Sequence, residues 1–297
     1  MRKIDLNNIK VARSETARQI NRRIVLNLVR KHQPISRAGL ARQSGLQRST
    51  VSAITEQLIS ERWVIEGAVG HLPRGRKPTF LHINSERAGI IGVDIQTTAT
   101  NLAVASVDSH FLAQESISTG HDPAEFVARL SRRIVDLMRA HPKGSYEGIG
   151  VSLPGRIDLA TQRLVFAPNL GWSDVDLKTP LEAATGLPVE LENAANACAL
   201  AELWSGRYTE SVRHLVAITV SEGIGVGMVM NGQLVQGPKG MAGEFGHVTV
   251  APDGPLCACG NRGCWETVAS NAAAMRYYAQ TKCFLSCERS FFRPVFK

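Results

Sequence analysis

The chain has 297 residues, of which 44% are hydrophobic and 20% are charged; this balance is typical of a globular protein of about two domains. No stretch approaches the ~18 consecutive apolar residues of a membrane span, and the start, MRKIDLNNIKVARSE, lacks the apolar core of a signal peptide. Composition therefore predicts a cytoplasmic protein with no membrane partner, a setting in which clustered cysteines more often bind metal than form disulfides.

Charge is unevenly distributed along the chain. Residues 1–83 hold 16 Lys and Arg against 5 Asp and Glu, whereas residues 84–275 hold 13 against 20. The final 22 residues are basic again, with 5 against 1. A basic head on an acidic body predicts a polyanion partner for the head and a different role for the body, although a solvated basic tail would carry the same excess.

The head, residues 1–83, has the pattern of a winged helix-turn-helix. Pro34 ends a first helix, and Ser36 is placed to cap a second helix in RAGLARQSG. Gly45 makes a turn before a third helix, QRSTVSAITEQLISERW, and two β-prone runs around a Gly/Pro-rich loop then predict a hairpin wing. The apolar positions that repeat at helical spacing in the first helix are Ile20, Ile24, Val25, Leu26 and Leu28.

Polar and basic side chains fall where this motif meets DNA. The N-terminal end of the third helix would face base edges and phosphates in the major groove, and the basic wing would contact phosphates or the minor groove. The candidate DNA-binding residues are Gln47, Arg48, Ser49, Thr50 and Ser52 on the helix, and Arg74, Arg76 and Lys77 on the wing. Plain helical packing gives similar helix pairs, but the basic excess, turn glycine and basic wing together favour a double-stranded DNA operator as partner.

The body begins after about residue 86 as a mixed α/β segment. GIIGVDIQTTATNLAVASVDSHFLAQESIST predicts three strands, a helix follows from about Pro123 to Ala140, and YEGIGVSLPGRID predicts a buried strand ending in a Pro-Gly turn. A second β-rich run starts at His214 and turns at Asn231-Gly232. This order predicts an α/β lobe with functional loops at the strand ends.

Three cysteines crowd into CACGNRGC, residues 257–264, shortly after a histidine. His247, Cys257, Cys259 and Cys264 form the pattern H-x9-C-x-C-x4-C, which supplies the four ligands that a closed tetrahedral Zn²⁺ site requires. A Cys257–Cys259 disulfide would be strained, and reduced packing cysteines fit poorly with so dense a cluster in a Gly-rich loop. The pattern predicts a structural zinc site.

Four motifs, in order, resemble those of the ROK family (repressors, open reading frames, kinases): VSLPGRIDLATQRLVFAPNLGWSDVDL, LPVELENAANACALAE, GMAGEFGHVTV and CACGNRGCWETVAS. The N-terminal winged helix places the chain with the family's transcriptional regulators, of the xylose and N-acetylglucosamine repressor type. The resemblance implies an α/β fold, namely a two-lobed actin-like sugar-kinase fold with a sugar pocket in its cleft, and the same four zinc ligands. By motif, the sugar-facing residues would be Gly155, Asn169, Asn193, Glu244, His247 and Glu266.

Three departures from the family's kinases argue against catalysis. Where those kinases carry the aspartate that serves as general base, this chain has Ala194, whose methyl group accepts no proton. The first phosphate loop, D-x-G-G-T in the kinases, is DIQTT here, and the second, G-T-G-I-G, is SEGIG, which places Glu222 where phosphate would lie. We therefore expect a sensor with no catalytic residue; an ATP-dependent sugar kinase with a DNA-binding appendage is the alternative.

The expected organisation has three parts. They are a winged helix-turn-helix at 1–83, a ROK sugar-binding domain at 84–282 and an atypical tail at 283–297. The ROK domain would hold a first lobe at about 86–195 and a partial second lobe with the zinc loop at about 196–282. The sequence after ETVASNAAAMRYYAQTK shows no helical periodicity, and regulators of the family usually continue further. We therefore expect an incomplete second lobe. A remnant whose head binds DNA but whose body does not fold is a further alternative.

The sequence thus predicts a sugar-responsive transcriptional regulator, a repressor of carbohydrate-utilisation genes. Two winged helices in a homodimer, or in a higher homo-oligomer, would bind a two-fold operator. A sugar or sugar phosphate effector would favour one arrangement of the lobes and hence one spacing of the DNA-binding heads.

Overall fold

The computed structural model describes residues 14–69, 78–205 and 212–280. The chain forms two compact units. One contains Met1–Gly92, Leu102–Glu115 and Arg133–Ile149, and the other contains Val93–Asn101, Ser116–Arg132 and Gly150–Lys297. Within the described ranges, no helix is both long and apolar enough to cross a membrane.

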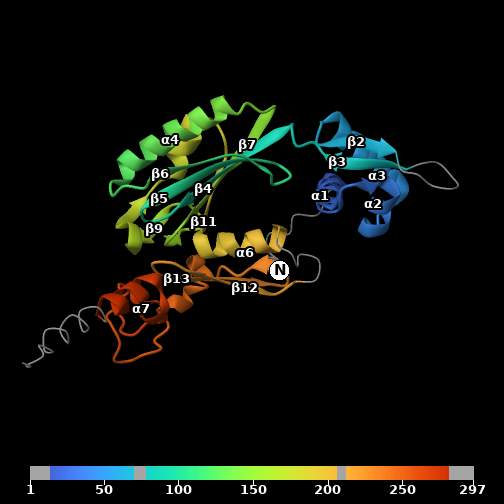
Figure 1. The fold of residues 1–297 in the computed structure, drawn as a ribbon. Helices are drawn as coiled ribbons and strands as arrows, with labels where there is room; N and C mark the ends of the chain where they lie inside the picture. Colours follow the sequence, from blue (N-terminus) through green and yellow to red (C-terminus); the bar gives the residue numbers. More distant parts are fainter. Residues whose placement is uncertain (1–13, 70–77, 206–211, 281–297) are drawn as a thin grey trace, which may run out of the picture. The chain divides into compact units, whose positions relative to one another are not determined.

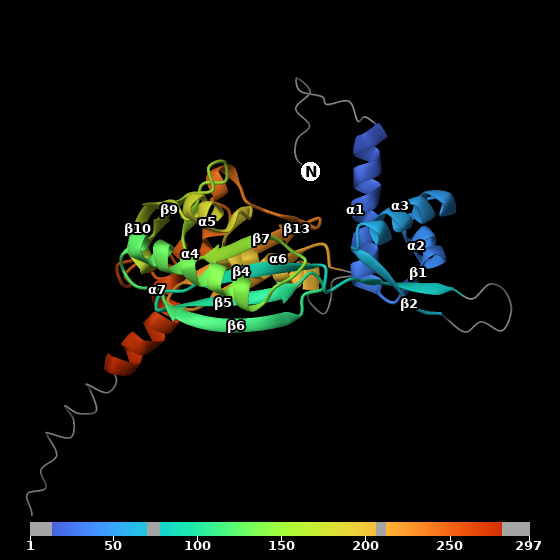
Figure 2. The same ribbon diagram turned by 90° about the horizontal axis from the view of Figure 1, so that it is seen from above.

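The head contains three helices and a small antiparallel sheet. The helices are α1 (Ser14–His32), α2 (Arg37–Ser44) and α3 (Arg48–Ser60), and the strands are β1 (Ile35–Ser36), β2 (Val64–Val69) and β3 (Thr79–Ile83). The sheet order is β1-β3-β2, and α2 and α3 pack beside α1 (Figure 2). The segment predicted to form the wing falls largely outside the described residues, between β2 and β3.

Local signals set the end of α1 and both ends of α2 as predicted, whereas α3 ends at Ser60, before the predicted Trp63. The Ser36 hydroxyl accepts a hydrogen bond of 3.1 Å from the Gly39 backbone N–H at the start of α2. At its end the Gly45 N–H donates to the Ala41 carbonyl at 3.1 Å. The first helix ends at His32, two residues before Pro34. The predicted caps of these helices are therefore confirmed.

One hydrophobic core joins the head elements. Its fully buried side chains are Val25, Val29, Leu40, Val51, Leu58, Val64 and Leu81. In α1 the helical repeat does not identify the buried face, because Ile20 and Ile24 are 52% and 40% exposed whereas Val25 and Val29 are buried. The face of α1 that packs inward is thus displaced by about one residue from the strongest apolar repeat.

The body contains a five-stranded sheet in the order β11-β7-β4-β5-β6. Its strands are β4 (Ala88–Ile95), β5 (Ala99–Ser106), β6 (Phe111–Ser118), β7 (Ser145–Leu153) and β11 (Val189–Asn193). Helix α4 (Pro123–Ala140) follows β6 and precedes β7 in the chain (Figure 1). Its apolar stripe, Phe126, Leu130, Ile134 and Leu137, is buried, so the predicted order of three strands, a helix and a further strand is confirmed.

A second, three-stranded antiparallel sheet follows, in the order β10-β9-β8. Its strands are β8 (Arg156–Ile157), β9 (Leu164–Ala167) and β10 (Trp172–Val175). The turn η1 (Pro168–Leu170) joins β9 to β10, and α5 (Lys178–Thr185) leads on to β11. Trp172 is buried against Phe126, with ring centroids 5.2 Å apart. This small sheet holds the Pro-Gly turn and η1 in place.

A third sheet has the strand order β12-β13-β14, and its strands are β12 (Leu215–Val220), β13 (Ile224–Met230) and β14 (Gln233–Leu234). Other elements of this part of the chain are α6 (Ala194–Ser205), η2 (Pro238–Gly240), η3 (Glu244–His247) and α7 (Trp265–Ala269), and residues 271–280 are also helical. Helix α6 packs against β12 and β13, and Met230 pairs with Gln233 across the predicted Asn231-Gly232 turn. Val216, Ile218 and Val220 on β12 are exposed.

Candidate functional site

A cavity of about 670 Å³ lies in the second compact unit. Its wall is formed by the Pro-Gly turn before β8, by η1, by the start of α6, by the loop into β13, by η3 and by the cysteine loop. This volume is in the range of pockets that hold small organic ligands. The cavity collects loops from separate strand ends, as the α/β pattern predicts.

All six residues predicted to face a sugar line this cavity. They are Gly155, Asn169, Asn193, Glu244, His247 and Glu266. They come from positions as far apart as the end of β7 and the start of α7. The fold thus brings into one wall amides, carboxylates and an imidazole, which can hydrogen-bond to sugar hydroxyls. Contact of each residue with a sugar stays a prediction.

Asn193 and Gly155 fix each other's position. The Asn193 Nδ2 donates to the Gly155 carbonyl at 2.9 Å, and its Oδ1 accepts from the Ala195 N–H at 2.9 Å. Gly155 has φ of 104°, and a Cβ there would lie 2.4 Å from the Phe166 carbonyl oxygen. Since no larger residue fits this turn, glycine is required. Asn193 therefore caps α6 and anchors the Pro-Gly turn, whatever it binds.

His247 lies between two carboxylates. Its Nε2 is 3.7 Å from Glu244 Oε2, and its Nδ1 is 3.3 Å from Glu266 Oε1. Nδ1 is also the nitrogen nearer to the cysteine cluster, 3.5 Å from Cys257 Sγ. The two ring nitrogens therefore face different groups, and both carboxylates have the imidazole as a neighbour.

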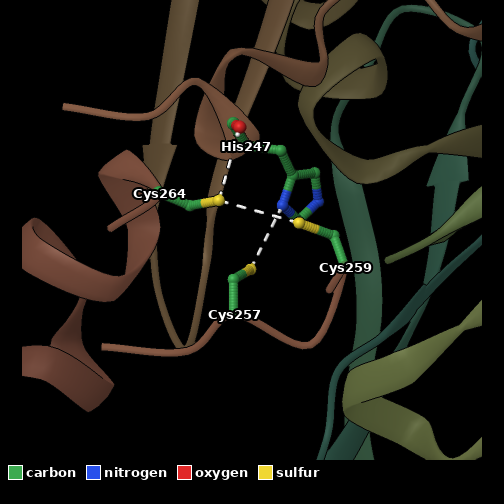
Figure 3. Close-up of side chains that lie close together, drawn as sticks. All are labelled: His247, Cys257, Cys259 and Cys264. Atoms are coloured by element: carbon green, nitrogen blue, oxygen red, sulfur yellow. Dashed lines mark hydrogen bonds between the residues drawn. The ribbon is translucent and has the colours of Figure 1, made fainter. Parts of the chain in front are cut away.

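The predicted metal ligands converge (Figure 3). The ligand atoms of His247, Cys257, Cys259 and Cys264 lie within 4.8 Å of one another, and the Sγ atoms of Cys259 and Cys264 are 3.6 Å apart. In a tetrahedral zinc site, with Zn–S of about 2.3 Å, two sulfurs lie about 3.8 Å apart. One imidazole and three thiols at this spacing can hold a metal ion.

The cysteine loop is shaped by close backbone packing. A Cβ on Gly263, whose φ is 61°, would overlap the Ala251 carbonyl oxygen, so only glycine fits beside Cys264. Burial raises the pKa of the Cys257 and Cys264 thiols, whereas the Asn261 backbone N–H lowers the pKa of Cys259. The buried thiols therefore resist ionisation without a cation, and a bound metal would supply the charge that favours their thiolates.

The loops that resemble kinase phosphate loops are joined by their own side chains. The Thr97 Oγ1 donates a hydrogen bond of 2.9 Å to Glu222 Oε1, and the Gln96 Nε2 donates one of 2.7 Å to Asp94 Oδ2. Ala194 stands at the start of α6 and lines the cavity with a methyl group. No proton acceptor replaces the expected base at this position.

The candidate DNA-binding residues on α3 stand at its N-terminal end. Gln47, Arg48 and Ser49 are exposed, Thr50 and Ser52 are half-buried, and the opposite face of the helix is buried in the head core. The first turn of α3 contains no acidic residue. The wing candidates Arg74, Arg76 and Lys77 lie outside the described residues.

Among the cavity residues that the sequence patterns did not indicate is one with a charged side chain, Arg156. It directly follows the Pro-Gly turn and lines the same cavity as Gly155. The signal that could have found it is its place in SLPGRID, one residue after a motif glycine at a strand end.

The arrangement of elements and the cavity define a sugar-kinase-like α/β protein. A model of the ROK family matches residues 90–293, and the chain belongs to the ROK family. It is 32% identical over 270 residues to the xylose repressor of Bacillus subtilis (strain 168), covering 90% of this chain and 70% of that protein. It is 33% identical over 267 residues to the xylose repressor of Caldicellulosiruptor bescii, covering 87% and 65%.

Solved structures give the same relationship. A ROK family transcriptional regulator, a homologue of the E. coli MLC protein, matches with a TM-score of 0.75 and 29% identity over 90% of this chain and 68% of that one. A ROK family glucokinase from Streptomyces griseus, in complex with glucose and AMPPNP, matches with a TM-score of 0.59 and 34% identity over 65% and 60%. The chain spans 65% to 70% of the length of the two xylose repressors above.

Proposed function

We propose that this protein is a sugar-responsive transcriptional repressor. A winged helix-turn-helix at residues 1–83 binds operator DNA, and a ROK body at 84–282 binds a sugar or sugar phosphate without phosphorylating it. The observation that carries this proposal is the extent of the matches. The Bacillus subtilis xylose repressor matches 90% of the chain, whereas the Streptomyces griseus glucokinase matches 65%. The repressor match is thus long enough to include the head.

The geometry of the head supports DNA binding. Helix α3 buries Val51, Ile54 and Leu58 and leaves Arg48 and its neighbours exposed at the N-terminal end. This end of a recognition helix is the part that contacts base edges and phosphates in the major groove. The net positive charge of the first 83 residues, 16 basic against 5 acidic, supplies the general attraction to the phosphate backbone.

The cavity supports binding of a sugar-sized effector. Its wall presents the Asn169 amide, the Glu244 and Glu266 carboxylates and the His247 imidazole. Such groups recognise vicinal hydroxyls through charge-assisted and neutral hydrogen bonds. Binding energy from these contacts shifts the protein between states only where the contacts differ between them.

We assign the His247, Cys257, Cys259 and Cys264 cluster to structural zinc. When bound, zinc would hold the four side chains in a closed tetrahedral set and favour the thiolate forms. His247 Nδ1 lies toward the cysteines and its Nε2 toward Glu244. Fixing the ring from the Nδ1 side would leave Nε2 oriented for a ligand in the cavity.

A sugar kinase is the second candidate, favoured by the match to the glucokinase. Three features of the chain weigh against it. Ala194 offers no general base, and Thr97 and Glu222 occupy the loop positions with side chains hydrogen-bonded to each other. The carboxylate of Glu222 would repel a polyphosphate. We infer that the body retains sugar binding and lacks phosphoryl transfer.

A homodimer would let the effector control DNA binding. Two heads related by a two-fold axis would bind two half-sites, and their spacing would depend on the state of the body. An effector that binds one state more tightly would change operator affinity through that spacing. This homodimer is part of the proposal.

The test starts with selection of DNA ligands from a random duplex library by the purified, zinc-loaded chain. Fluorescence anisotropy on an enriched duplex then follows affinity while xylose, glucose, N-acetylglucosamine and their phosphates are added. A repressor of the proposed kind enriches a two-fold sequence, and one sugar weakens its binding. The proposal would be contradicted if no DNA sequence were enriched. It would also be contradicted if a sugar bound the protein, as shown by a higher melting temperature, but no such sugar changed the affinity for DNA.

A further inference from the structure

Arg156 is a charged residue of the cavity wall to which the proposed function gives no role. It is the first residue of β8 and pairs with Phe166 of β9 across the small sheet. Both residues line the cavity. Because β8 follows the Pro154-Gly155 turn without a spacer, the sheet and the turn together fix where this side chain begins.

The guanidinium of Arg156 has no hydrogen-bond or ion-pair partner among residues 14–69, 78–205 and 212–280, although the residue is half-buried. Arg163, on the loop between β8 and β9, is different. Its Nε donates to Asp174 Oδ1 at 3.1 Å, and a terminal nitrogen lies 3.3 Å from Asp176 Oδ2. A guanidinium carries five N–H donors and is always charged. Arg156 is therefore a residue of the cavity wall whose donors have no partner in the described part of the chain.

Asp158 and the two carboxylates of the cavity wall have other partners. Asp158, two residues further on, accepts hydrogen bonds at Oδ1 from the Ala160 N–H at 2.9 Å and from the Thr161 N–H at 2.8 Å. On the cavity wall, Glu244 and Glu266 both have His247 as their neighbour, at 3.7 and 3.3 Å. These three acids therefore do not neutralise the positive charge of Arg156.

A second basic residue lies on the same side. The η2 turn packs against β8, since a Cβ at Gly240 would be 3.1 Å from the Ile157 carbonyl oxygen. Lys239 directly precedes that glycine, and its charge contributes to lowering the pKa of Asp158, after the larger effect of the hydrogen bonds from Thr161 and Ala160. Lys239 thus adds a positive charge on this side, opposite the carboxylate of Asp158.

We propose that Arg156 selects an effector with an anionic substituent, a monosaccharide that carries a phosphate or a carboxylate. The proposal rests on the proposed function, because it takes the cavity as the effector site. A planar guanidinium matches both anions with two parallel hydrogen bonds. The hydroxyls of the same molecule would face the amides, carboxylates and imidazole of the remaining wall. A neutral sugar would offer the guanidinium hydroxyl acceptors but no counter-charge.

Isothermal titration of the zinc-loaded full chain tests this selection. The ligands are glucose and xylose, glucose 6-phosphate and xylose 5-phosphate, gluconate and xylonate, and inorganic phosphate alone. We expect one anionic sugar to bind about 10-fold or more tightly than its neutral parent, as a charge-assisted hydrogen bond would provide. The phosphate and acid arms identify which anion is recognised.

Two variants of equal charge separate recognition from general electrostatics. Arg156→Gln should weaken the anionic sugar about 10-fold or more and leave the neutral parent unchanged. Arg163→Gln removes the same charge outside the cavity wall and should leave both unchanged. Arg156→Lys should recover part of the affinity, since it keeps the charge without the planar fork. Thermal melting of each variant checks that it folds.

The outcomes distinguish this inference from the proposed function. A neutral sugar that binds as tightly as every anionic one, or an Arg156→Gln variant that behaves as Arg163→Gln does, overturns the role of Arg156 and leaves sugar sensing intact. Binding of inorganic phosphate as tightly as any sugar phosphate also overturns it, because the sugar would then contribute nothing. If no sugar of either class binds, sugar sensing itself is wrong, whatever DNA the head selects.

Discussion

Thr97 donates a hydrogen bond of 2.9 Å from its Oγ1 to the Oε1 of Glu222. The two residues are 125 positions apart in the chain and belong to the two loops that resemble the phosphate loops of ROK kinases. In this protein the loops are joined to each other by side chains, and one of those side chains is a carboxylate. A nucleotide phosphate would have to break this bond and approach a like charge.

Nucleotide binding should therefore be limited by Glu222. Wild-type protein should show no ADP release in a coupled assay with ATP and a sugar panel. Replacing the carboxylate in Glu222→Gln should raise affinity for AMPPNP about 10-fold, since a repulsion of about 1.4 kcal/mol is removed. Calorimetric titration measures this change.

Glu190→Gln is the matched control for this experiment, because Glu190 is exposed on β11 and lies outside the cavity wall. Its AMPPNP affinity should equal that of wild type. Sugar-dependent ADP release by the wild-type protein would show that the body is a kinase despite Ala194.

The metal cluster should be required for the stability of the cavity wall. Cys264 is fully buried, and its Sγ lies 3.6 Å from Cys259 Sγ. Cys264→Ser should lose the zinc that wild type carries, about one ion per chain, and should melt at least about 5 °C lower, because metal binding contributes to folding free energy. Elemental analysis and thermal melting measure the two effects.

Cys198→Ser controls for the loss of a thiol. Cys198 is a free cysteine on α6, outside the cluster, so its replacement should keep the zinc content of wild type. Retention of zinc by Cys264→Ser at the wild-type level would mean that the four residues are not the ligand set.

How well the sequence predicted the structure depended on how local each signal is. The Ser36 cap, the Gly45 turn and the Asn231-Gly232 hairpin each arise from a few adjacent residues, and the structure contains all three. The cysteine cluster is nearly as local, since three of its four members lie within eight residues.

Contacts between residues far apart in the chain could not be predicted from the sequence patterns. The Thr97–Glu222 hydrogen bond joins distant loops, and the isolation of Arg156 depends on which acids are already engaged elsewhere. In α1, helical spacing predicted an amphipathic helix but not that Val25 and Val29, rather than Ile20 and Ile24, would be buried. That choice depends on the angle at which α2 and α3 pack against α1.

Acid should weaken the head through Glu61, which follows α3. Burial alone would raise its pKa, but hydrogen bonds from Gln57 and Arg22, together with the charges of Arg22 and Arg87, outweigh burial and lower the pKa from its usual value of 4.5. A carboxylate with a lower pKa in the folded state stabilises the fold above its unfolded pKa, and this stability is lost as pH falls through the folded pKa. Wild type should therefore exceed Glu61→Gln in melting temperature at pH 7, and the difference should shrink as pH falls below about 4.5.

Wild type and Glu61→Gln share the metal cluster, so its sensitivity to acid cancels when their melting temperatures are compared at the same pH. Glu125→Gln on α4 changes an exposed carboxylate and serves as the control. A difference between wild type and Glu61→Gln that stays constant from pH 7 to the acid limit would show that Glu61 stabilises the head through packing rather than charge.

DNA binding should depend on Arg48, the first residue of α3. Arg48→Ala should lower affinity for an enriched duplex about 10-fold or more at physiological salt, because the exposed guanidinium stands where a recognition helix meets DNA. If Arg48 contacts a phosphate, the slope of log K against log salt should fall by about 1; if it contacts a base, the variant should instead tolerate substitutions at one operator position. Arg132→Ala removes one exposed charge from α4 and should bind as wild type does. Equal affinity and equal salt slope for the two variants would exclude α3 as the recognition helix and would leave the basic head without its proposed role.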